Sequence, residues 1–183
     1  MLKRRGMLKP SGTLAIARSF PPIADANARV LVLGSMPGTA SLLAGRYYAH
    51  PCNVFWSIMG DLLAFSRAIS YAQRTRRLKR AGVAMWDVMA CCEREGSLDS
   101  SIDDASIVPN DFRAFFANHA RVRHVFFNGV KARDCFWRTV LPGLGVCGLR
   151  FARLPSTSSA HASLSLAGKL QAWRALVDAL AEN

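Results

Sequence analysis

The residues best suited to carry chemistry lie between positions 30 and 56, directly after a short apolar run. Residues 30–33 are uniformly apolar and rich in valine, which is typical of a strand buried on both faces. The sequence then breaks at Gly34-Ser35-Met36-Pro37-Gly38, where two glycines and a proline predict a turn whose backbone can approach another molecule closely. Hydrogen-bonding and stacking groups follow at high density: Arg46, Tyr47, Tyr48, His50, Cys52, Asn53, Phe55 and Trp56.

Ligands of open α/β sheets bind beyond the carboxyl ends of the strands, so this turn is a candidate pocket wall. A turn of this kind also serves simply to join a strand to a helix, and Phe55 and Trp56 also suit a core position. The density of polar groups after the buried strand favours the pocket.

The elements that must position these groups alternate along the chain. We expect strands at about 29–33, 82–88, 124–127 and 148–154; helices at about 54–65, from Asn110 or Asp111 to 119, 131–140 and 162–180; and loops at 93–109 and 155–160. Strands alternating with helices predict an α/β fold, a three-layer α/β/α sandwich with a central four-stranded parallel sheet. We expect residues 1–27 to form a basic N-terminal tail and residues 28–183 to form a single domain.

The charge balance is strongly basic, with 24 Lys and Arg against 12 Asp and Glu and a net charge of +12. Such an excess predicts attraction to a polyanion, either nucleic acid or an anionic membrane. The basic run within residues 67–80 suits a solvated helix face and a phosphate contact equally well. No apolar run is long enough to span a membrane, and the N-terminal residues lack the apolar core of a secretory signal, so we expect no membrane partner.

The five cysteines argue against a metal or disulfide framework, because their number is odd and no C-x-x-C pair occurs. This pattern is typical of a reducing compartment, and we expect a cytoplasmic monomer. We expect no zinc site, no iron–sulfur cluster and no other cofactor.

Four blocks of the sequence together resemble a known family of DNA repair enzymes. G-S-M-P-G, followed by Y-Y-A-H-P-x-N-x-F-W, resembles the first motif region of the uracil-DNA glycosylase superfamily. The nearest branch is the hypoxanthine (deoxyinosine) DNA glycosylases, with the mismatch-specific uracil glycosylases next. The resemblance continues through GVAMWDVMACCEREGSLDSSI, F-N-G-x-K-A and L-P-S-T-S-S-A-H, from about residue 30 to the C-terminus.

The resemblance implies an enzyme that hydrolyses the N-glycosidic bond of a deaminated base flipped out of DNA and leaves an abasic site. Hypoxanthine is the expected base, with uracil as a second candidate. No lysine lies in a helix-hairpin-helix context, which favours a monofunctional enzyme. Two alternatives stay open: a mismatch-specific uracil or thymine glycosylase, and a catalytically silent DNA-binding module.

Asn53 matches the asparagine of the family's H-P-x-N segment and is the first candidate for catalysis. Its amide can orient water at the sugar carbon or donate to the base, and its structural alternative is to tie down a loop. Met36 stands where many uracil glycosylases carry a water-activating Asp or Asn. Methionine can do neither job, which points to the branch in which the asparagine of H-P-x-N has taken over.

The residues expected to hold the base are the turn residues Gly34, Ser35, Met36 and Pro37, together with Tyr48 and Asp87. Tyr48 matches the aromatic that stacks on the flipped base, with Tyr47 as its competitor and a core position as the alternative for either. Asp87 ends a predicted strand where relatives read the base edge. Its alternatives are a helix N-cap and a salt bridge to an arginine.

The late motif supplies the remaining candidates. His161 is expected to approach the base and stabilise its charge, or else to cap the start of the last helix. The hydroxyls and backbone N–H groups of Ser156, Thr157 and Ser158, close to that predicted helix start, would suit a DNA phosphate, and Lys131 is a second phosphate candidate. Relatives tend to carry proline where Ser159 stands, and we interpret His50 as structural.

Overall fold

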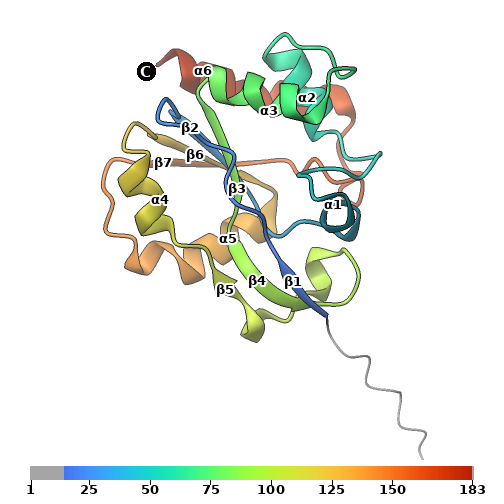
Figure 1. Ribbon diagram of the computed structural model, residues 1–183, viewed down its shortest axis with the longest axis vertical. Coiled ribbons are helices and arrows are strands. Elements are labelled where there is room, and N and C mark those ends of the chain that lie inside the picture. The colour runs from blue at the N-terminus through green and yellow to red at the C-terminus, as the bar shows by residue number, and fades with distance from the viewer. Residues whose placement is uncertain (1–14, 183) are drawn as a thin grey trace, which may run out of the picture.

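The computed structural model describes residues 15–182 and is organised around a four-stranded parallel sheet. The strand order is β3 (Val83–Asp87), β2 (Val30–Gly34), β6 (His124–Asn128) and β7 (Arg150–Leu154) (Figure 1). Every residue of β2 and β3 is buried, as their continuous apolar sequences predict. The predicted four-stranded parallel sheet is confirmed.

Helices cover both faces of this sheet and complete the predicted three layers (Figure 1). One layer contains α2 (Phe55–Leu62), α3 (Tyr71–Arg80) and α6 (Leu166–Ala181), and the opposite layer contains α4 (Phe112–Asn118) and α5 (Val130–Thr139). Three 3-10 turns, at Asp99–Ser101, Asp104–Ser106 and Leu141–Gly143, and a short helix α1 (Thr39–Ala44) lie in the connections.

Side-chain caps explain where α4 and α6 begin. Asp111 caps α4 by accepting a hydrogen bond from the backbone N–H of Ala114 at 3.0 Å, as one of the two expected caps. The last helix begins at Leu166, four residues later than predicted, because Ser165 is its N-cap and accepts from the N–H of Gly168 at 3.2 Å. Residues 162–165 therefore extend the loop that precedes it.

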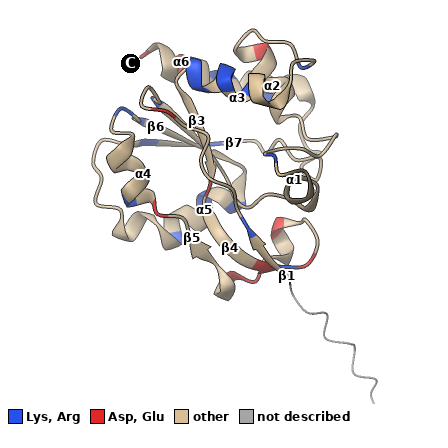
Figure 2. Cartoon of the chain, viewed as in Figure 1, with Lys and Arg blue, Asp and Glu red and all other residues tan. Residues whose placement is uncertain are grey.

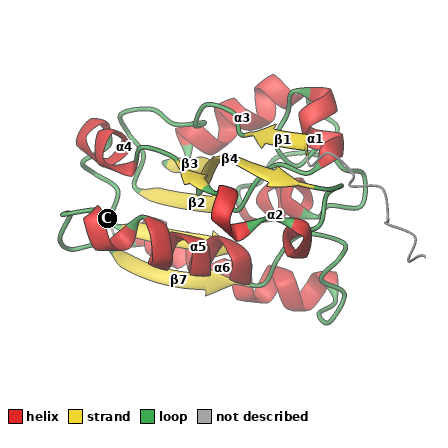
Figure 3. Cartoon of the chain, turned by 90° about the horizontal axis from the view of Figure 1, so that it is seen from below, coloured by secondary structure: helices red, strands yellow, loops and turns green. Residues whose placement is uncertain are grey.

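A second, smaller antiparallel sheet was not expected from the sequence. It consists of β1 (Ala15–Arg18), β4 (Met89–Arg94) and β5 (Val108–Pro109), and Figure 3 shows β1 and β4 on the β3 side of the main sheet. The predicted loop at 93–109 is thus wrong at both of its ends. β1 and β5 have only four and two residues, and the burial of β4 does not alternate along the strand, so no strand pattern marks this sheet in the sequence.

The same sheet corrects the predicted domain boundary at residue 28. Ala17 in β1 is aligned with Cys92 in β4, and Ile23 forms a β-bridge with Met85 of β3. Residues 15–19 and Ile23 are therefore paired with the domain instead of forming part of a tail. The expectation of a basic tail at residues 1–14 lies outside the described residues.

The basic run lies on α3, whose only buried residue is Leu78. A capping box between Ser70 and Gln73 starts the helix, and Figure 2 shows Lys and Arg gathered along it. Arg74 lies over the ring of Trp56, with its guanidinium carbon 5.8 Å from the ring centroid. Among the described residues, no helix has both the length and the apolar character needed to cross a bilayer.

Candidate active site

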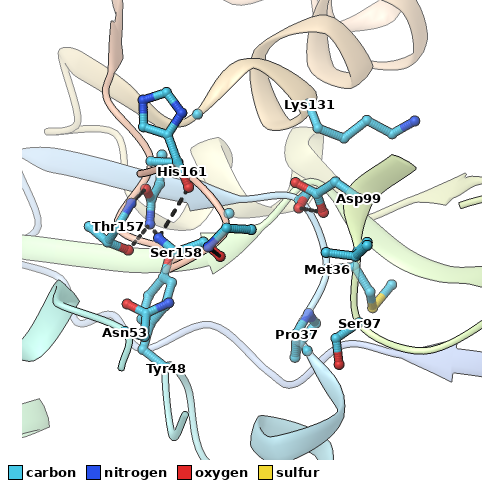
Figure 4. Close-up of a pocket in the computed structure, with 18 of the residues that line it drawn as sticks. Met36, Pro37, Tyr48, Asn53, Ser97, Asp99, Lys131, Thr157, Ser158 and His161 are labelled. Carbon is cyan, nitrogen blue, oxygen red and sulfur yellow. Dashed lines mark hydrogen bonds between the residues drawn. The ribbon is translucent and has the colours of Figure 1, made fainter. Parts of the chain in front are cut away.

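A cavity of about 660 Å³ opens at the carboxyl edge of the main sheet. Its walls come from the ends of β2, β3 and β6 and from a loop that follows β7. All twelve site residues that the sequence predicted border this one cavity: Gly34, Ser35, Met36, Pro37, Tyr48, Asn53, Asp87, Lys131, Ser156, Thr157, Ser158 and His161. Figure 4 shows Met36 and Pro37 across the cavity from Thr157 and Ser158, with Tyr48 and Asn53 beneath the latter pair.

Asn53 uses one end of its amide to hold the loop and leaves the other end free. Its Oδ1 accepts the backbone N–H of Phe55 at 3.0 Å, where α2 begins. Because a backbone N–H can only be met by the oxygen, this contact identifies the other atom as Nδ2. Nδ2 has no hydrogen-bond partner within residues 15–182. The loop-tying role therefore applies to Oδ1, and a donor remains for a ligand.

Tyr48 has the left-handed backbone conformation that is uncommon outside glycine, with φ of 54°. Its ring stacks on Phe55, with the centroids 4.0 Å apart and the planes inclined by 21°. Tyr47, its competitor, is 3% exposed and donates its hydroxyl to the carbonyl of Phe20 at 3.1 Å. Tyr47 is thus fixed in the core, and Tyr48 is the better placed of the two to stack on a ligand.

Asp87 lies at the floor of the cavity and is only 3% exposed. Its Oδ2 accepts from the hydroxyl of Ser19 at 2.7 Å. Both structural alternatives for Asp87 are wrong: a strand and not a helix follows it, and it has no ion pair within the described part of the chain. Burial, with a smaller contribution from the charge of Asp99, raises the pKa of Asp87 to about 7.

Gly34 is required by the close approach of this carboxylate to β2. A Cβ atom at position 34 would lie 2.4 Å from Asp87 Oδ1 and 3.2 Å from the hydroxyl oxygen of Tyr48. Neither atom is at the end of a long flexible side chain, so any larger residue would displace the floor of the cavity. The absence of a side chain at Gly34 is therefore as important to the cavity as the backbone of the turn.

Hydrogen bonds that the sequence did not predict hold the turn at residues 34–38. The N–H groups of Val88 and Met89 donate to the carbonyls of Gly34 and Ser35 at 2.9 and 3.1 Å. Arg94, 3% exposed, donates from Nη2 to the carbonyl of Pro37 at 2.6 Å and from Nε to the carbonyl of Gly96 at 3.0 Å.

Asp99 also belongs to the site, although its position fell in a predicted loop. Its Oδ1 accepts from the Ser35 hydroxyl at 2.7 Å, and its residue borders the cavity. Desolvation raises the pKa of the Asp99 carboxyl. The run of Ser and Asp residues around it was the only sequence signal, and it is also what an ordinary surface loop would contain.

Asn128 is a further site residue that the sequence analysis missed. Its Oδ1 accepts the backbone N–H of Thr157 at 2.8 Å, and its Nδ2 donates to Thr157 Oγ1 at 2.9 Å and to the Tyr48 hydroxyl at 3.1 Å. The amide thus joins β6, Tyr48 and the late loop. The available signal was an asparagine at the end of a buried strand, at the same sheet edge as Gly34 and Asp87.

The loop at residues 155–161 is held mainly by side chains from distant elements. Trp173 Nε1 donates to the carbonyl of Pro155 at 3.0 Å, and Lys169 Nζ donates to the carbonyls of Ser158 and His161 at 3.3 and 2.8 Å. Lys169 is 5% exposed, and desolvation lowers the pKa of its ammonium group. No sequence motif marks this lysine, which lies on the buried side of α6.

Three expectations about the late motif need correction. Thr157 borders the cavity but is 0% exposed, and its hydroxyl accepts from Asn128, so its side chain does not face a phosphate. His161 does not cap α6, because Ser165 does. The loop 155–161 also ends five residues before α6, so its N–H groups do not lie at a helix N-terminus.

The remaining candidates lie at the mouth of the cavity. The His161 ring points away from Asn53 and Tyr48 (Figure 4), and its Nε2 lies 3.2 Å from the Ser163 hydroxyl. Lys131 Nζ is paired with Asp104, which also pairs with Arg138. Within residues 15–182 no group of three or more His, Cys, Asp and Glu side chains is arranged to hold a metal ion.

Comparisons with known proteins show the family to which the chain belongs. A family model described as the Uracil DNA glycosylase superfamily matches residues 21–177. The chain is similar to a protein of Methanosarcina acetivorans named hypoxanthine DNA glycosylase, with 34% identity over 151 residues, 82% of this chain and 91% of that protein. A protein of the same name from Methanosarcina barkeri is 35% identical over 129 residues, 70% of this chain and 79% of that protein.

A solved structure shows the same fold. It is the solution NMR structure of a Methanosarcina acetivorans protein described as a candidate uracil DNA glycosylase, with a TM-score of 0.76 and 33% identity. The match covers 91% of this chain and 99% of that one. The family model covers most of the domain, including the turn, the cavity floor and the late loop. The chain belongs to the uracil DNA glycosylase superfamily.

Proposed function

We propose that this DNA glycosylase hydrolyses the N-glycosidic bond of deoxyinosine in DNA, releasing hypoxanthine and leaving an abasic site. The observation that carries the proposal is the convergence of Tyr48, Asp87 and the free Nδ2 of Asn53 on one cavity. The names of the two Methanosarcina relatives support the choice of base. Met36 supports it too, because the turn then offers no acid or amide to activate water.

The proposed binding of the base follows from the contacts described above. Flipping a base out of the stack costs a few kcal/mol, and the cavity must offset that cost. Tyr48, backed by Phe55, offers an aromatic face, and stacking on such a face is worth about 1–3 kcal/mol. Gly34, Ser35 and Pro37 form the wall beside it, and Asp87 faces the base from the floor.

The proposed chemistry relies on fixed donors. Glycosidic bond cleavage passes through a transition state with positive charge on the sugar and negative charge on the departing base. A donor held at the base lowers the barrier because it needs no reorientation during the reaction. Asn53 Nδ2 is such a donor, since the contact between Oδ1 and Phe55 holds the amide in place.

DNA binding would use the loop at 155–161 and the net charge of +12. The backbone N–H groups and hydroxyls of Ser156 and Ser158 are candidates for a phosphate, and His161 lies beside them at the cavity mouth. Lys131 would first have to leave Asp104. We propose that the enzyme acts as a monomer and that it needs no metal.

A panel of duplexes with a single lesion tests this function. Purified protein in a chelator should release hypoxanthine from deoxyinosine faster than it releases uracil, xanthine or mismatched thymine. Faster release of uracil or thymine opposite guanine would identify a mismatch-specific enzyme instead. Salt-dependent binding without release of any base would identify a silent DNA-binding module, and loss of activity in chelator would identify a metal enzyme.

A further inference from the structure

The carboxyl group of Asp87 presents one oxygen to the cavity and keeps the other behind it. Oδ2 accepts a hydrogen bond from the Ser19 hydroxyl at 2.7 Å, and Ser19 directly follows β1 in the sequence. Oδ1 has no hydrogen-bond partner in the described part of the chain and lies beside Gly34, where only the absence of a Cβ atom makes room for it. This oxygen is therefore available to a base in the cavity.

Burial and the charge of Asp99 favour the neutral form of Asp87, whereas the Ser19 hydroxyl and Arg94 favour the ionised form. The groups that face it are the Asp99 carboxyl, the hydroxyls of Tyr47 and Tyr48, and the Arg94 guanidinium. Of these only Arg94 is a cation, and its hydrogen bonds go to the carbonyls of Pro37 and Gly96. With burial as the main cause, the pKa of Asp87 is raised to about 7, so a large fraction of the carboxyl carries a proton at neutral pH.

A departing purine needs a proton, and a protonated carboxyl group can donate one. When the C1′–N9 bond breaks, its electron pair stays on the base, and a proton on a ring nitrogen lets hypoxanthine leave as a neutral molecule. Asn53 can donate a hydrogen bond to the base, but an amide cannot release its proton at this pH. Asp87, Asp99 and Asp134 are the carboxyl residues among the described residues that border the cavity, and of these only Asp87 is buried. Its Oδ1 has no partner in the described part of the chain, whereas Asp99 is exposed and its Oδ1 is bonded to Ser35.

We propose that Asp87 enters the reaction protonated and is the general acid that transfers its proton to the departing purine. The C1′–N9 bond breaks, its electron pair moves to the base, and the Asp87 proton passes from the carboxyl to a ring nitrogen. Water adds to C1′, and the proton that it loses restores the acid. This inference rests on the proposed release of hypoxanthine.

An ionised Asp87 that accepted a hydrogen bond from an N–H of the base would act by a different mechanism, and the rate would have the opposite pH dependence. If the protonated form is required, the rate is highest at low pH and falls as the pH rises through about 7. If the ionised form is required, the rate rises over the same range. The direction of the profile therefore separates a proton donor from a hydrogen-bond acceptor.

The experiment measures single-turnover release of hypoxanthine from a deoxyinosine duplex between about pH 5 and about pH 9. Wild type should lose activity as the pH rises through about 7. Asp87→Asn should be slower by about 10²-fold at the acidic end and should lose this pH dependence. Far-UV circular dichroism and thermal unfolding establish that the variant is folded.

Two further variants shift the profile without removing the acid. Ser19→Ala removes the hydrogen bond that favours the ionised form, so its midpoint should move to higher pH. Asp99→Asn removes a repelling charge while keeping an acceptor for Ser35, so its midpoint should move to lower pH. Opposite shifts from two neighbours on different elements are not expected of a purely structural Asp87.

The possible failures are distinguishable. Activity that rises through about pH 7, or a wild-type profile retained in Asp87→Asn, would overturn the acid role and leave the proposed function intact. Absence of shifts in both Ser19→Ala and Asp99→Asn would overturn it equally, even if Asp87→Asn failed to fold. A wild-type protein that released no hypoxanthine at any pH would overturn the proposed function and this inference with it.

Discussion

The two walls of the cavity are built in different ways. The turn at 34–38 is continuous with β2, is almost entirely buried, and takes backbone hydrogen bonds from Val88 and Met89. The loop at 155–161 takes most of its support from the side chains of Asn128, Lys169 and Trp173. One wall is therefore anchored to the sheet by backbone hydrogen bonds, to which Arg94 and Asp99 add side-chain contacts, whereas the other depends mainly on side-chain contacts and can be loosened separately.

The largest effect should come from filling the rigid wall. Gly34→Ala places a Cβ atom 2.4 Å from Asp87 Oδ1, and Asp87 is itself held by Ser19. We expect single-turnover release of hypoxanthine to fall by at least about 10²-fold, because small displacements of catalytic groups have effects of this size. Gly143→Ala is the matched control, since its Cβ would meet only Arg113 Nη2 at 3.9 Å, outside the cavity. Equal activity of the two variants would contradict a rigid floor.

Removing the Asn128 amide, which holds the loop at 155–161, should have the next largest effect. Asn128→Ala leaves the buried N–H of Thr157 without its acceptor and frees the Tyr48 hydroxyl. We expect a loss of about 1–3 kcal/mol in the free energy of unfolding and faster hydrogen exchange in the 155–161 loop than in the 34–38 turn. Asn128→Asp keeps the acceptor for Thr157 and should exchange more slowly than Asn128→Ala. Equal exchange in both walls would remove the distinction between them.

The smallest effect should come from Lys169→Met. The carbonyls of Ser158 and His161 lose their donor, but the cost of burying an ammonium group is also removed, so the net change in stability should be small. We expect weaker DNA binding by a few-fold with a nearly unchanged rate for bound substrate, because the loop and not the floor is altered. Arg174→Met, at an exposed position of the same helix, makes the same change in net charge. Identical binding by the two variants would assign the effect to charge alone.

The main sheet was predictable because β2, β3 and β6 contain short apolar runs and helical segments separate its strands. Burial on both faces makes β2 and β3 uniformly apolar, and that pattern survives in the sequence. The second sheet was not predictable, since β1 and β5 have four and two residues and gain their conformation from pairing with β4. Strand pairing over such short segments is a tertiary effect.

The members of the candidate site were predictable where a motif names them, and their contacts were not. Tyr48, Asn53 and Asp87 followed from resemblance and from their positions after strands. The side chain of Thr157 is bonded to Asn128, 29 residues away in the sequence, and Asn128 is bonded to Tyr48, 80 residues away. The buried ammonium group of Lys169 is bonded to Ser158, 11 residues away. A single sequence contains no record of such pairings.

We propose that the free Nδ2 of Asn53 acts on the base or on the attacking water. This role is tested most directly by single-turnover release of hypoxanthine in Asn53→Ala, with Asn53→Ser as a control that retains an oxygen for the Phe55 N–H. Loss of one fixed donor of this kind typically slows a reaction by about 10²–10³-fold, and we predict that loss in both variants, with DNA affinity unchanged. A near-wild-type rate in either folded variant would contradict the account.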